Sequence, residues 1–321
     1  MERFTALTRT VPLIIGLAVV AILTIVLCTF TGPAGFGFVT TAPGAADIVG
    51  GIRFPRVLAA FFVGASLAVA GAAMQALFRN PMADPYILGT SSGGALGASL
   101  AVVFLGGIFV PIFAWIGAVV AILVVWSIAG RKGMIPVETL LLTGVAVSFF
   151  FSAIVSFLIA IAGQNVHQIL FWLMGGFWNA SPSSAILAAF ILVPAGTLLF
   201  VMGRDLNALS LGEETAAHLG IDAGRARWTV LGASTLLVAG AVSIAGSVGF
   251  IGLVTPHIVR MLIGPDNRVV IPASMLAGGI ILVLSDTIAR TFFSDLPVGI
   301  ITAFVGAPFF IWLICQRGTN T

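Results

Sequence analysis

The chain has 321 residues, of which 60% are hydrophobic and only 8% are charged, and its formal net charge is +3. An ordinary soluble domain has roughly a quarter of its residues charged, so this composition excludes a water-soluble globular protein. The charges also cluster, which leaves long apolar stretches that each have room for a membrane-spanning helix of about 20 residues.

These stretches predict an all-α, polytopic membrane protein. They are continuous apolar runs without the period-two alternation of a transmembrane β-barrel, and a lipid-exposed backbone must satisfy its own hydrogen bonds. We expect one transmembrane domain over residues 1–321 with ten spans, the eighth being short. The predicted spans are Val11–Phe30, Val57–Phe78, Tyr86–Leu105, Pro111–Ala129, Glu138–Ile161, Ser184–Met202, Trp228–Ser247, Gly249–Ile263, Val269–Ala289 and Pro297–Cys315.

The N-terminal segment has two interpretations. Arg3 and Arg9 precede an apolar run, as in a secretory signal, with Thr40–Ala46 as a loose cleavage region. Because everything downstream is also membrane-like, we interpret Val11–Phe30 as an uncleaved first span. Cys28 and Cys315 then end the first and last spans, and we expect no disulfide between them.

Basic residues predict the orientation. With a cytoplasmic N-terminus, the inner loops hold eleven of the 14 basic residues, and ten spans return the C-terminus to the cytoplasm. The inner basic residues are Arg3, Arg9, Arg79, Arg131, Lys132, Arg204, Arg225, Arg227, Arg260, Arg268 and Arg317. Only Arg53, Arg56 and Arg290 fall outside, and these exceptions need an explanation of their own.

The longest polar interruption is residues 204–227, on the cytoplasmic side. Its part Ala208–Leu219 is rich in good helix formers, which predicts one short helix or two. Small residues recur inside the spans, as in Gly64–Gln75, Ser91–Ser99 and Ala239–Gly252. Such residues let helix backbones approach closely, so we interpret them as packing positions.

No residue pattern predicts an enzyme. A phosphate-binding P-loop ends in Gly-Lys-Ser/Thr, but the single lysine, Lys132, is followed by Gly133. Paired carboxylates, metal-spaced Cys and His, and a nucleophile with its base are likewise not evident, so we expect no cofactor and no metal site. We therefore do not expect this chain to be an enzyme by itself.

Ionisable residues inside the spans are few, and each has a structural interpretation beside a functional one. Asp286 lies one helical turn before Arg290, and we favour an i, i+4 ion pair over a proton-coupling role. For His257 we favour a hydrogen-bonded core histidine over a pathway residue. The aromatic stretch Asn165–Asn179 is typical of an outer interfacial belt, with a vestibule wall as the alternative.

Five blocks of the sequence resemble the FecCD-type permeases, a family that imports ferric siderophores, haem and cobalamin. The resemblance runs from about Asp47 to the C-terminus. Its blocks are Arg53–Ala98, FWLMGGF at Phe171–Phe177, LGEETAAHLGI at Leu211–Ile221, GFIGLVTPHIVR at Gly249–Arg260 and Leu296–Ile314.

The resemblance implies a permease domain of ten helices in the cytoplasmic (inner) membrane. It implies a homodimer with the translocation path between subunits, two cytoplasmic ATPase subunits and an extracytoplasmic substrate-binding protein. Lipid is then the remaining partner, and nucleic acid is not expected. Alternating access would be driven by ATP hydrolysis in the partner subunits.

The resemblance also assigns site residues. The three outer arginines, Arg53, Arg56 and Arg290, would dock the binding protein. Segment 204–227 would couple to the ATPase through Leu209, Leu211, Gly212, Glu213, Glu214, Ala217, Leu219 and Gly220. The turn Asn80–Leu88 and the link near Pro136 would form cytoplasmic gate regions, with Asn80, Pro81, Asp84 and Pro85 in the first of them.

Two other functions stay open from the sequence. An ion-gradient-driven secondary transporter shares the composition and the span count, and a non-transporting membrane scaffold is a weaker alternative. The sequence also leaves the chelate open among ferric siderophore, haem and cobalamin, because we expect the binding protein, rather than the permease, to select the ligand.

Overall fold

The structure is a computed structural model, and it describes residues 2–32, 35–36, 47–129 and 137–318. Its longer helices are α1 (Glu2–Phe30), α3 (Phe54–Leu77), α4 (Thr90–Leu105), α5 (Val110–Ala129), α6 (Val137–Ile161), α8 (Pro182–Val201), α11 (Ala223–Ala245), α12 (Ile251–Ile263), α13 (Asn267–Phe292) and α14 (Val298–Gly318). Short elements are the strands β1 (Thr31–Gly32) and β2 (Gly35–Phe36), the π-helix η1 (Ile48–Arg53), the 3-10 turn η3 (Gly163–Asn165), α7 (Val166–Met174), α9 (Gly203–Leu211) and α10 (Glu213–His218).

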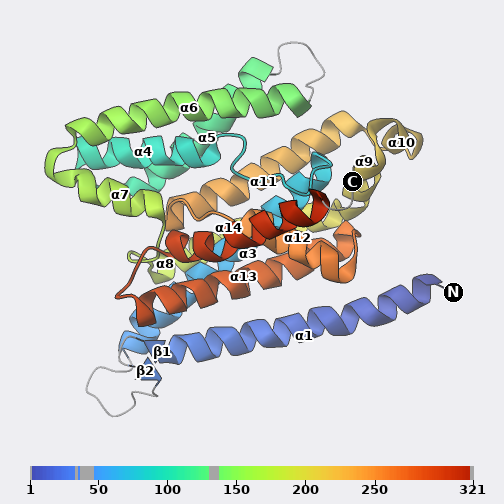
Figure 1. The fold of residues 1–321 in the computed structure, drawn as a ribbon, viewed down its shortest axis with the longest axis horizontal. Helices are drawn as coiled ribbons and strands as arrows, with labels where there is room; N and C mark the ends of the chain where they lie inside the picture. Colours follow the sequence, from blue (N-terminus) through green and yellow to red (C-terminus); the bar gives the residue numbers. More distant parts are fainter. Residues whose placement is uncertain (1, 33–34, 37–46, 130–136, 319–321) are drawn as a thin grey trace.

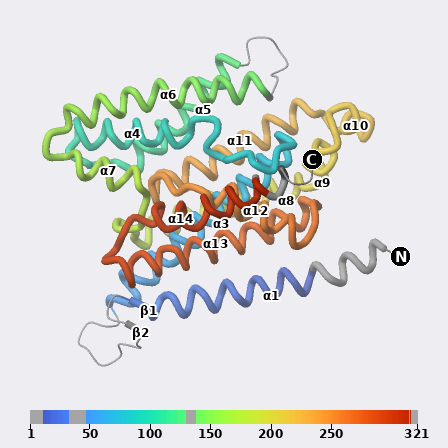
Figure 2. Tube along the Cα trace, viewed as in Figure 1, coloured from blue at the N-terminus to red at the C-terminus, as the bar shows by residue number. Residues whose placement is uncertain are grey.

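The long helices lie side by side in one bundle, so the predicted all-α fold is confirmed (Figure 1). α1 lies along one edge and α6 along the opposite edge. α9 and α10 lie at one end of the bundle, where α1 begins and α14 ends (Figure 1), and β1 lies at the other end, directly after α1 (Figures 1 and 2). We call these the α9–α10 end and the β1–β2 end.

α3 is the central helix of the bundle. In an apolar 18-residue stretch of η1 and α3, 89% of the residues are buried, against 11% in the corresponding stretch of α1 and 28% in that of α6. α3 packs against α8, α11, α12 and α13, and its sequence is rich in alanine and glycine. Its small side chains bring the neighbouring backbones close, as expected for helix packing inside a membrane.

Two glycine contacts show how close this packing is. A Cβ on Gly64 would overlap the carbonyl oxygen of Gly278 in α13, and a Cβ on Gly71 would overlap that of Gly252 in α12. Pro256 lies one turn after Gly252 inside α12 and has no N–H to donate to the Gly252 carbonyl. The freed carbonyl therefore faces the Gly71 backbone, and the packing interpretation of these glycines is confirmed.

Each predicted span overlaps one apolar helix of the described residues, although α1 begins at Glu2 rather than at Val11 and α11 begins at Ala223 rather than at Trp228. Seven of these helices are long and apolar enough to cross a membrane, and three are shorter, namely Thr90–Leu105, Ile251–Ile263 and Val298–Leu313. α12, with 13 residues, is the short eighth helix that the sequence predicted. α4 begins at Thr90 rather than at Tyr86, because the preceding residues form a chain of turns.

The exterior of the bundle is apolar along its length. Phe149 of α6, Phe190 of α8 and Phe304 of α14 are each at least 74% exposed. Large aromatic side chains in such positions need lipid or partner helices around them. The chain is therefore a multi-pass membrane protein.

Candidate functional site

Four charged side chains meet at the β1–β2 end, where α3 begins and α13 ends. Arg56 of α3 forms ion pairs with Asp286 of α13 at 2.7 Å and with Asp295, in the link to α14, at 2.6 Å. Its Nε also donates to both carboxylate oxygens of Asp286 at 3.1 Å. Arg290 pairs with the same carboxylate at 3.7 Å. We call Arg56, Asp286, Arg290 and Asp295 the charge cluster; its two cations and two anions compensate one another.

Most of the charge cluster is buried. The side chains of Asp286, Arg290 and Arg56 are 2%, 5% and 13% exposed, and Arg290 also donates to the backbone carbonyl of Cys28 in α1. The expected Asp286–Arg290 pair is thus confirmed. Arg290 is buried in this structure, because an internal carboxylate and a backbone carbonyl hold its charge, and its docking role stays a prediction. Arg56 is likewise engaged inside the chain.

Arg53 differs from the two cluster arginines. It ends η1, is half-buried, and takes part in no ion pair among the described residues. Its guanidinium lies over Gly32 of β1 and leaves no room for a Cβ there. Of the three predicted docking residues, Arg53 is therefore the one whose charge no described carboxylate compensates.

The charge cluster also holds the link between α13 and α14. Ser294 and Asp295 have φ values of 52° and 68°, a left-handed conformation that is uncommon for residues other than glycine. Arg56 binds the Asp295 carboxylate, and the Trp178 indole donates to the Asp295 carbonyl at 3.1 Å. Side chains from α3 and from the α7–α8 link thus fix this strained turn.

The predicted gate turn, Asn80–Leu88, folds as two successive Asx turns. Asn80 Oδ1 accepts a hydrogen bond from the Met82 amide at 2.9 Å, and Asp84 Oδ1 accepts one from the Tyr86 amide at 2.7 Å. The fixed φ of Pro81 and Pro85, each directly after a turn-forming residue, favours this geometry. Pro136, the residue predicted for the second gate region, lies outside the described residues.

The gate turn packs against the turn before α12, at residues 246–250. The Tyr86 hydroxyl donates to the Val248 carbonyl at 3.1 Å, and the Pro85 ring fills the space where a Cβ of Gly252 would lie. Burial raises the pKa of the Asp84 carboxyl to about 6, and the hydrogen bond from Tyr86 offsets only part of this effect. The gate turn is therefore an interior element rather than a solvated loop.

Segment 204–227 forms two helices, α9 and α10, the second of the two possibilities that the sequence left open. Gly212, with φ of 127°, separates them, and Gly220, with φ of 78°, ends the turn after α10. Both values lie in the region that favours glycine. Glu213 pairs with Arg227 of α11, which fixes α10 against the bundle.

The α9–α10 segment has a buried side and an exposed side. Leu209 and Ala216 are 4% and 0% exposed and pack into the main hydrophobic cluster. Leu211 and Leu219 are 71% and 63% exposed, and Glu214 and Ala217 lie exposed between them. Leu209 is thus a packing residue, whereas the other predicted coupling residues Leu211, Glu214, Ala217 and Leu219 lie on the open surface.

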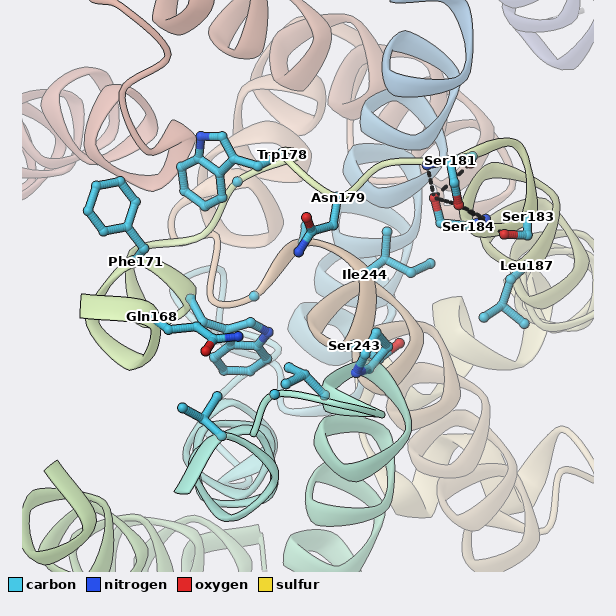
Figure 3. Close-up of a pocket in the computed structure, with 18 residues that line it drawn as sticks. Gln168, Phe171, Trp178, Asn179, Ser181, Ser183, Ser184, Leu187, Ser243 and Ile244 are labelled. Carbon is cyan, nitrogen blue, oxygen red and sulfur yellow. Dashed lines mark hydrogen bonds between the residues drawn. The ribbon is translucent and has the colours of Figure 1, made fainter. Parts of the chain in front are cut away.

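A cavity of about 410 Å³ lies near the β1–β2 end, between α7, the α7–α8 link and the end of α11 (Figure 3). Phe171 and Trp178 flank it, Gln168 and Asn179 add amide groups, and Ser181 and Ser184 add hydroxyl groups. None of the described residues that line it is charged. The aromatic stretch Asn165–Asn179 therefore lines a cavity and is more than an interfacial belt.

His257 is 8% exposed and its ring packs edge-on against Phe309 of α14, which fits the core interpretation. Within the described part of the chain, His, Cys, Asp and Glu side chains form no group of three that could hold a metal ion.

The FecCD transport family matches the chain over residues 13–316. The chain belongs to this family. One relative is the cobalamin import system permease protein BtuC of Halobacterium salinarum, which is 42% identical over 97% of this chain and 83% of its own length. Another is the hemin transport system permease protein HmuU of Yersinia pestis, which is 39% identical over 83% of this chain and 82% of its own length.

A solved structure shares the fold of this FecCD chain. It is described as a metal-chelate type ABC transporter in an inward-facing conformation, has 32% sequence identity and a TM-score of 0.88, and the match covers 95% of this chain and 99% of that one. The resemblance inferred from the five sequence blocks is therefore confirmed.

The sequence analysis did not predict the two carboxylate partners of Arg56. Asp286 and Asp295 lie on the same side of the predicted topology as Arg53, Arg56 and Arg290. A charge inside a membrane protein needs a partner. The presence of both acidic and basic residues on that side is therefore the sequence feature that could have predicted the charge cluster.

Proposed function

We propose that this FecCD chain is the permease subunit of an ATP-binding-cassette importer that moves a metal chelate across the cytoplasmic membrane. The observation that carries the proposal is the 42% identity to a cobalamin import permease over 97% of the chain. The fold match to a metal-chelate type ABC transporter supports it. Of the three chelate classes, we propose a corrinoid such as cobalamin as the substrate.

The uncharged cavity near the β1–β2 end favours a corrinoid over haem or a polyanionic siderophore complex. Its indole, amide and hydroxyl groups suit an apolar ring with amide side chains. Haem propionates and catecholate oxygens carry negative charge, and burying such charge without a cationic partner costs far more than burying a hydrogen-bonded amide. A relative named for hemin transport keeps haem as the second substrate to test.

We propose ten spans with both termini in the cytoplasm, so that the α9–α10 end is the inner end. The distribution of arginines supports this orientation, because eleven of the 14 basic residues fall on the predicted inner side. In the proposed assembly, two copies of the chain form a homodimer, each copy binds a cytoplasmic ATPase subunit, and an extracytoplasmic binding protein delivers the chelate.

Each surface then has one proposed partner. The ATPase contacts the exposed side of α9–α10, where Leu211 and Leu219 supply apolar contacts and Glu214 supplies charge. The binding protein docks at the β1–β2 end, where Arg53 is the residue available for a partner carboxylate. The gate turn closes the inner end of the path, and the domain motion is a rigid-body one.

The test is transport in proteoliposomes that contain the permease with its ATPase and the cognate binding protein. We expect ATP-dependent uptake of cobalamin, unchanged by a protonophore, and no uptake with an ATPase that cannot hydrolyse ATP. Uptake that needs no ATPase but collapses with a protonophore would instead establish an ion-driven carrier. Hydrolysis stimulated by haem rather than by cobalamin would correct the substrate alone.

A further inference from the structure

Five polar side chains form a continuous run of hydrogen bonds at the α9–α10 end. Asn207 of α9 donates to the Asp266 carboxylate at 2.7 Å and accepts from both the backbone and the side-chain amide of Asn267 at 2.8 Å. Asn267 Oδ1 accepts from Arg260 of α12 at 2.8 Å, and Arg260 also donates to Gln75 Oε1 of α3 at 2.8 Å. We call Gln75, Asn207, Arg260, Asp266 and Asn267 the amide junction.

Every amide in the junction uses both its donor and its acceptor. Gln75 accepts from Arg260 and donates to the Leu253 carbonyl of α12 at 3.0 Å, and Asn267 accepts from Arg260 and donates to Asn207. Gln75 and Asn267 are 3% and 2% exposed, so water cannot replace a lost partner easily. The direction of each hydrogen bond is therefore fixed by the next one.

Arg260 is held by neutral oxygens alone in this network. Its guanidinium donates to Gln75, to Asn267 and to the Ala72 carbonyl, and no ion pair of the described residues includes it. Its position depends on the orientation of two side-chain amides, and Asn207 sets one of them. A shift of Asn207 thus changes the surroundings of a charge between α3 and α12.

The apolar contacts of α9 do not have this directionality. Leu206 and Leu209 are 0% and 4% exposed and hold α9 against the bundle by apolar packing. Apolar packing is non-directional and tolerates small sliding, whereas a hydrogen bond weakens steeply as its angle changes. The hydrogen bonds of Asn207 therefore constrain how a displacement of α9 moves Asp266 and Asn267.

The two ends of α12 connect the amide junction with the gate turn. Arg260 lies in the last turn of α12, and Gly252 in its first turn contacts Pro85. Gly252 and Arg260 are eight positions apart on this helix, a rise of about 12 Å at 1.5 Å per residue. The turn before α12 also binds Tyr86 through the Val248 carbonyl. A movement received at Arg260 therefore reaches the gate turn through a single helix.

We propose that Asn207 is the positioning residue that links the ATPase-contacting segment to α12, so that movement of α9 is transmitted to the gate turn. This inference rests on the proposed importer function and adds to it the route between the coupling segment and the gate.

The deciding variant is Asn207→Asp, which keeps the size and the acceptor oxygen but replaces the donor to Asp266 with a second carboxylate oxygen. Burial would raise the pKa of Asp266, but the Asn207 hydrogen bond and Arg268 outweigh it and hold that pKa below its ordinary value. Two carboxylates would then face each other across the former 2.7 Å contact. The double variant Asn207→Asp with Asp266→Asn restores one donor and one acceptor with their positions exchanged, and asparagine also caps a helix.

The measurement is the number of ATP molecules hydrolysed per chelate taken up, together with copurification of the ATPase. We expect Asn207→Asp to copurify normally but to need about tenfold more ATP per chelate, and the double variant to recover most of this loss. Ser156→Ala, which removes an exposed hydroxyl from α6 outside both the amide junction and the α9–α10 segment, is the matched control and keeps the wild-type ratio.

A wild-type ratio in Asn207→Asp would overturn the inference, as would equal losses in the single and double variants or loss of ATPase binding in both. If wild-type protein shows no ATP-dependent uptake, the proposed importer function fails, which is a separate result from any difference among the variants.

Discussion

An arginine buried in a membrane protein needs anions close by, and Arg56 has two. The carboxylates of Asp286 and Asp295 contact its guanidinium at 2.7 and 2.6 Å, while Arg290 shares Asp286 from the other side. Removing one partner of such a group leaves an uncompensated buried charge, which costs about 3–5 kcal/mol. The main work of Arg56 is therefore to hold α3, α13 and the turn at Asp295 together.

We predict that Arg56→Glu lowers the thermal stability of the detergent-solubilised protein strongly, because the charge cluster would then hold three carboxylates and a single cation, Arg290. Arg53→Glu is the matched control: it lies three residues earlier and has no described ion pair, so its stability change stays within about 0.5 kcal/mol. Thermal unfolding followed by tryptophan fluorescence measures both. Equal stability of Arg56→Glu and wild type would show that the charge cluster does not stabilise the fold.

Asp84 gives a pH-dependent prediction. Its pKa is raised from 3.8 to about 6 by burial, so the folded protein binds this proton more tightly than the unfolded chain. The contribution of Asp84 to the free energy of unfolding is then greatest below pH 3.8, falls as the pH rises through this window, and stays level above pH 6. Asp84→Asn keeps the acceptor of the Asx turn without a charge.

Asp84→Asn should accordingly melt at a higher temperature than wild type near neutral pH, with the difference vanishing below pH 3.8. The measurement is the melting temperature of both proteins across this pH range. A pH-independent difference would mean that the ionisation of Asp84 has no part in it.

At the scale of elements, the contact between α3 and α12 depends on two features that act together. Pro256 removes the donor that would occupy the Gly252 carbonyl, and Gly71 offers no Cβ to block it. The two backbones therefore meet without side chains between them, which permits a weak Cα–H···O interaction. α12 is thereby held at Gly252 beside α3 and at Arg260 by the amide junction.

We predict that Gly71→Ala destabilises the protein by about 1–3 kcal/mol, because the new methyl group overlaps the Gly252 carbonyl. Gly232→Ala in α11 is the matched control, since nothing lies within 4 Å of the added Cβ. That control should gain up to about 1 kcal/mol from better helix propensity. Chemical or thermal unfolding in detergent compares the two, and equal stabilities would contradict the close contact.

At the scale of the whole molecule, the apolar stretches alone predicted where the seven long apolar helices and the three shorter ones of the described residues lie, because a span in a membrane is set by length and hydropathy. The sequence did not predict α7, η1 or the β1–β2 hairpin, whose residues lack a strong period. Nor did it predict the hydrogen bond from Arg290 to the Cys28 carbonyl or the one from Asn267 to Asn207, since each joins segments far apart in the chain. Contacts between residues distant in sequence come from tertiary packing, which a charge count or a periodicity does not contain.

The remaining global question is which end of the bundle faces the cytoplasm, and two serines answer it. Ser183 is exposed near the β1–β2 end and Ser210 is exposed at the α9–α10 end. With Cys28 and Cys315 replaced by alanine, a single cysteine at either position reports its side of the membrane. Because eleven of the 14 basic residues are predicted on the α9–α10 side, the positive-inside rule places Ser210 in the cytoplasm. We therefore predict that a membrane-impermeant thiol reagent labels Ser183→Cys in intact spheroplasts and labels Ser210→Cys only after permeabilisation. The reverse pattern would invert the topology and, with it, the proposed positions of the ATPase and of the binding protein.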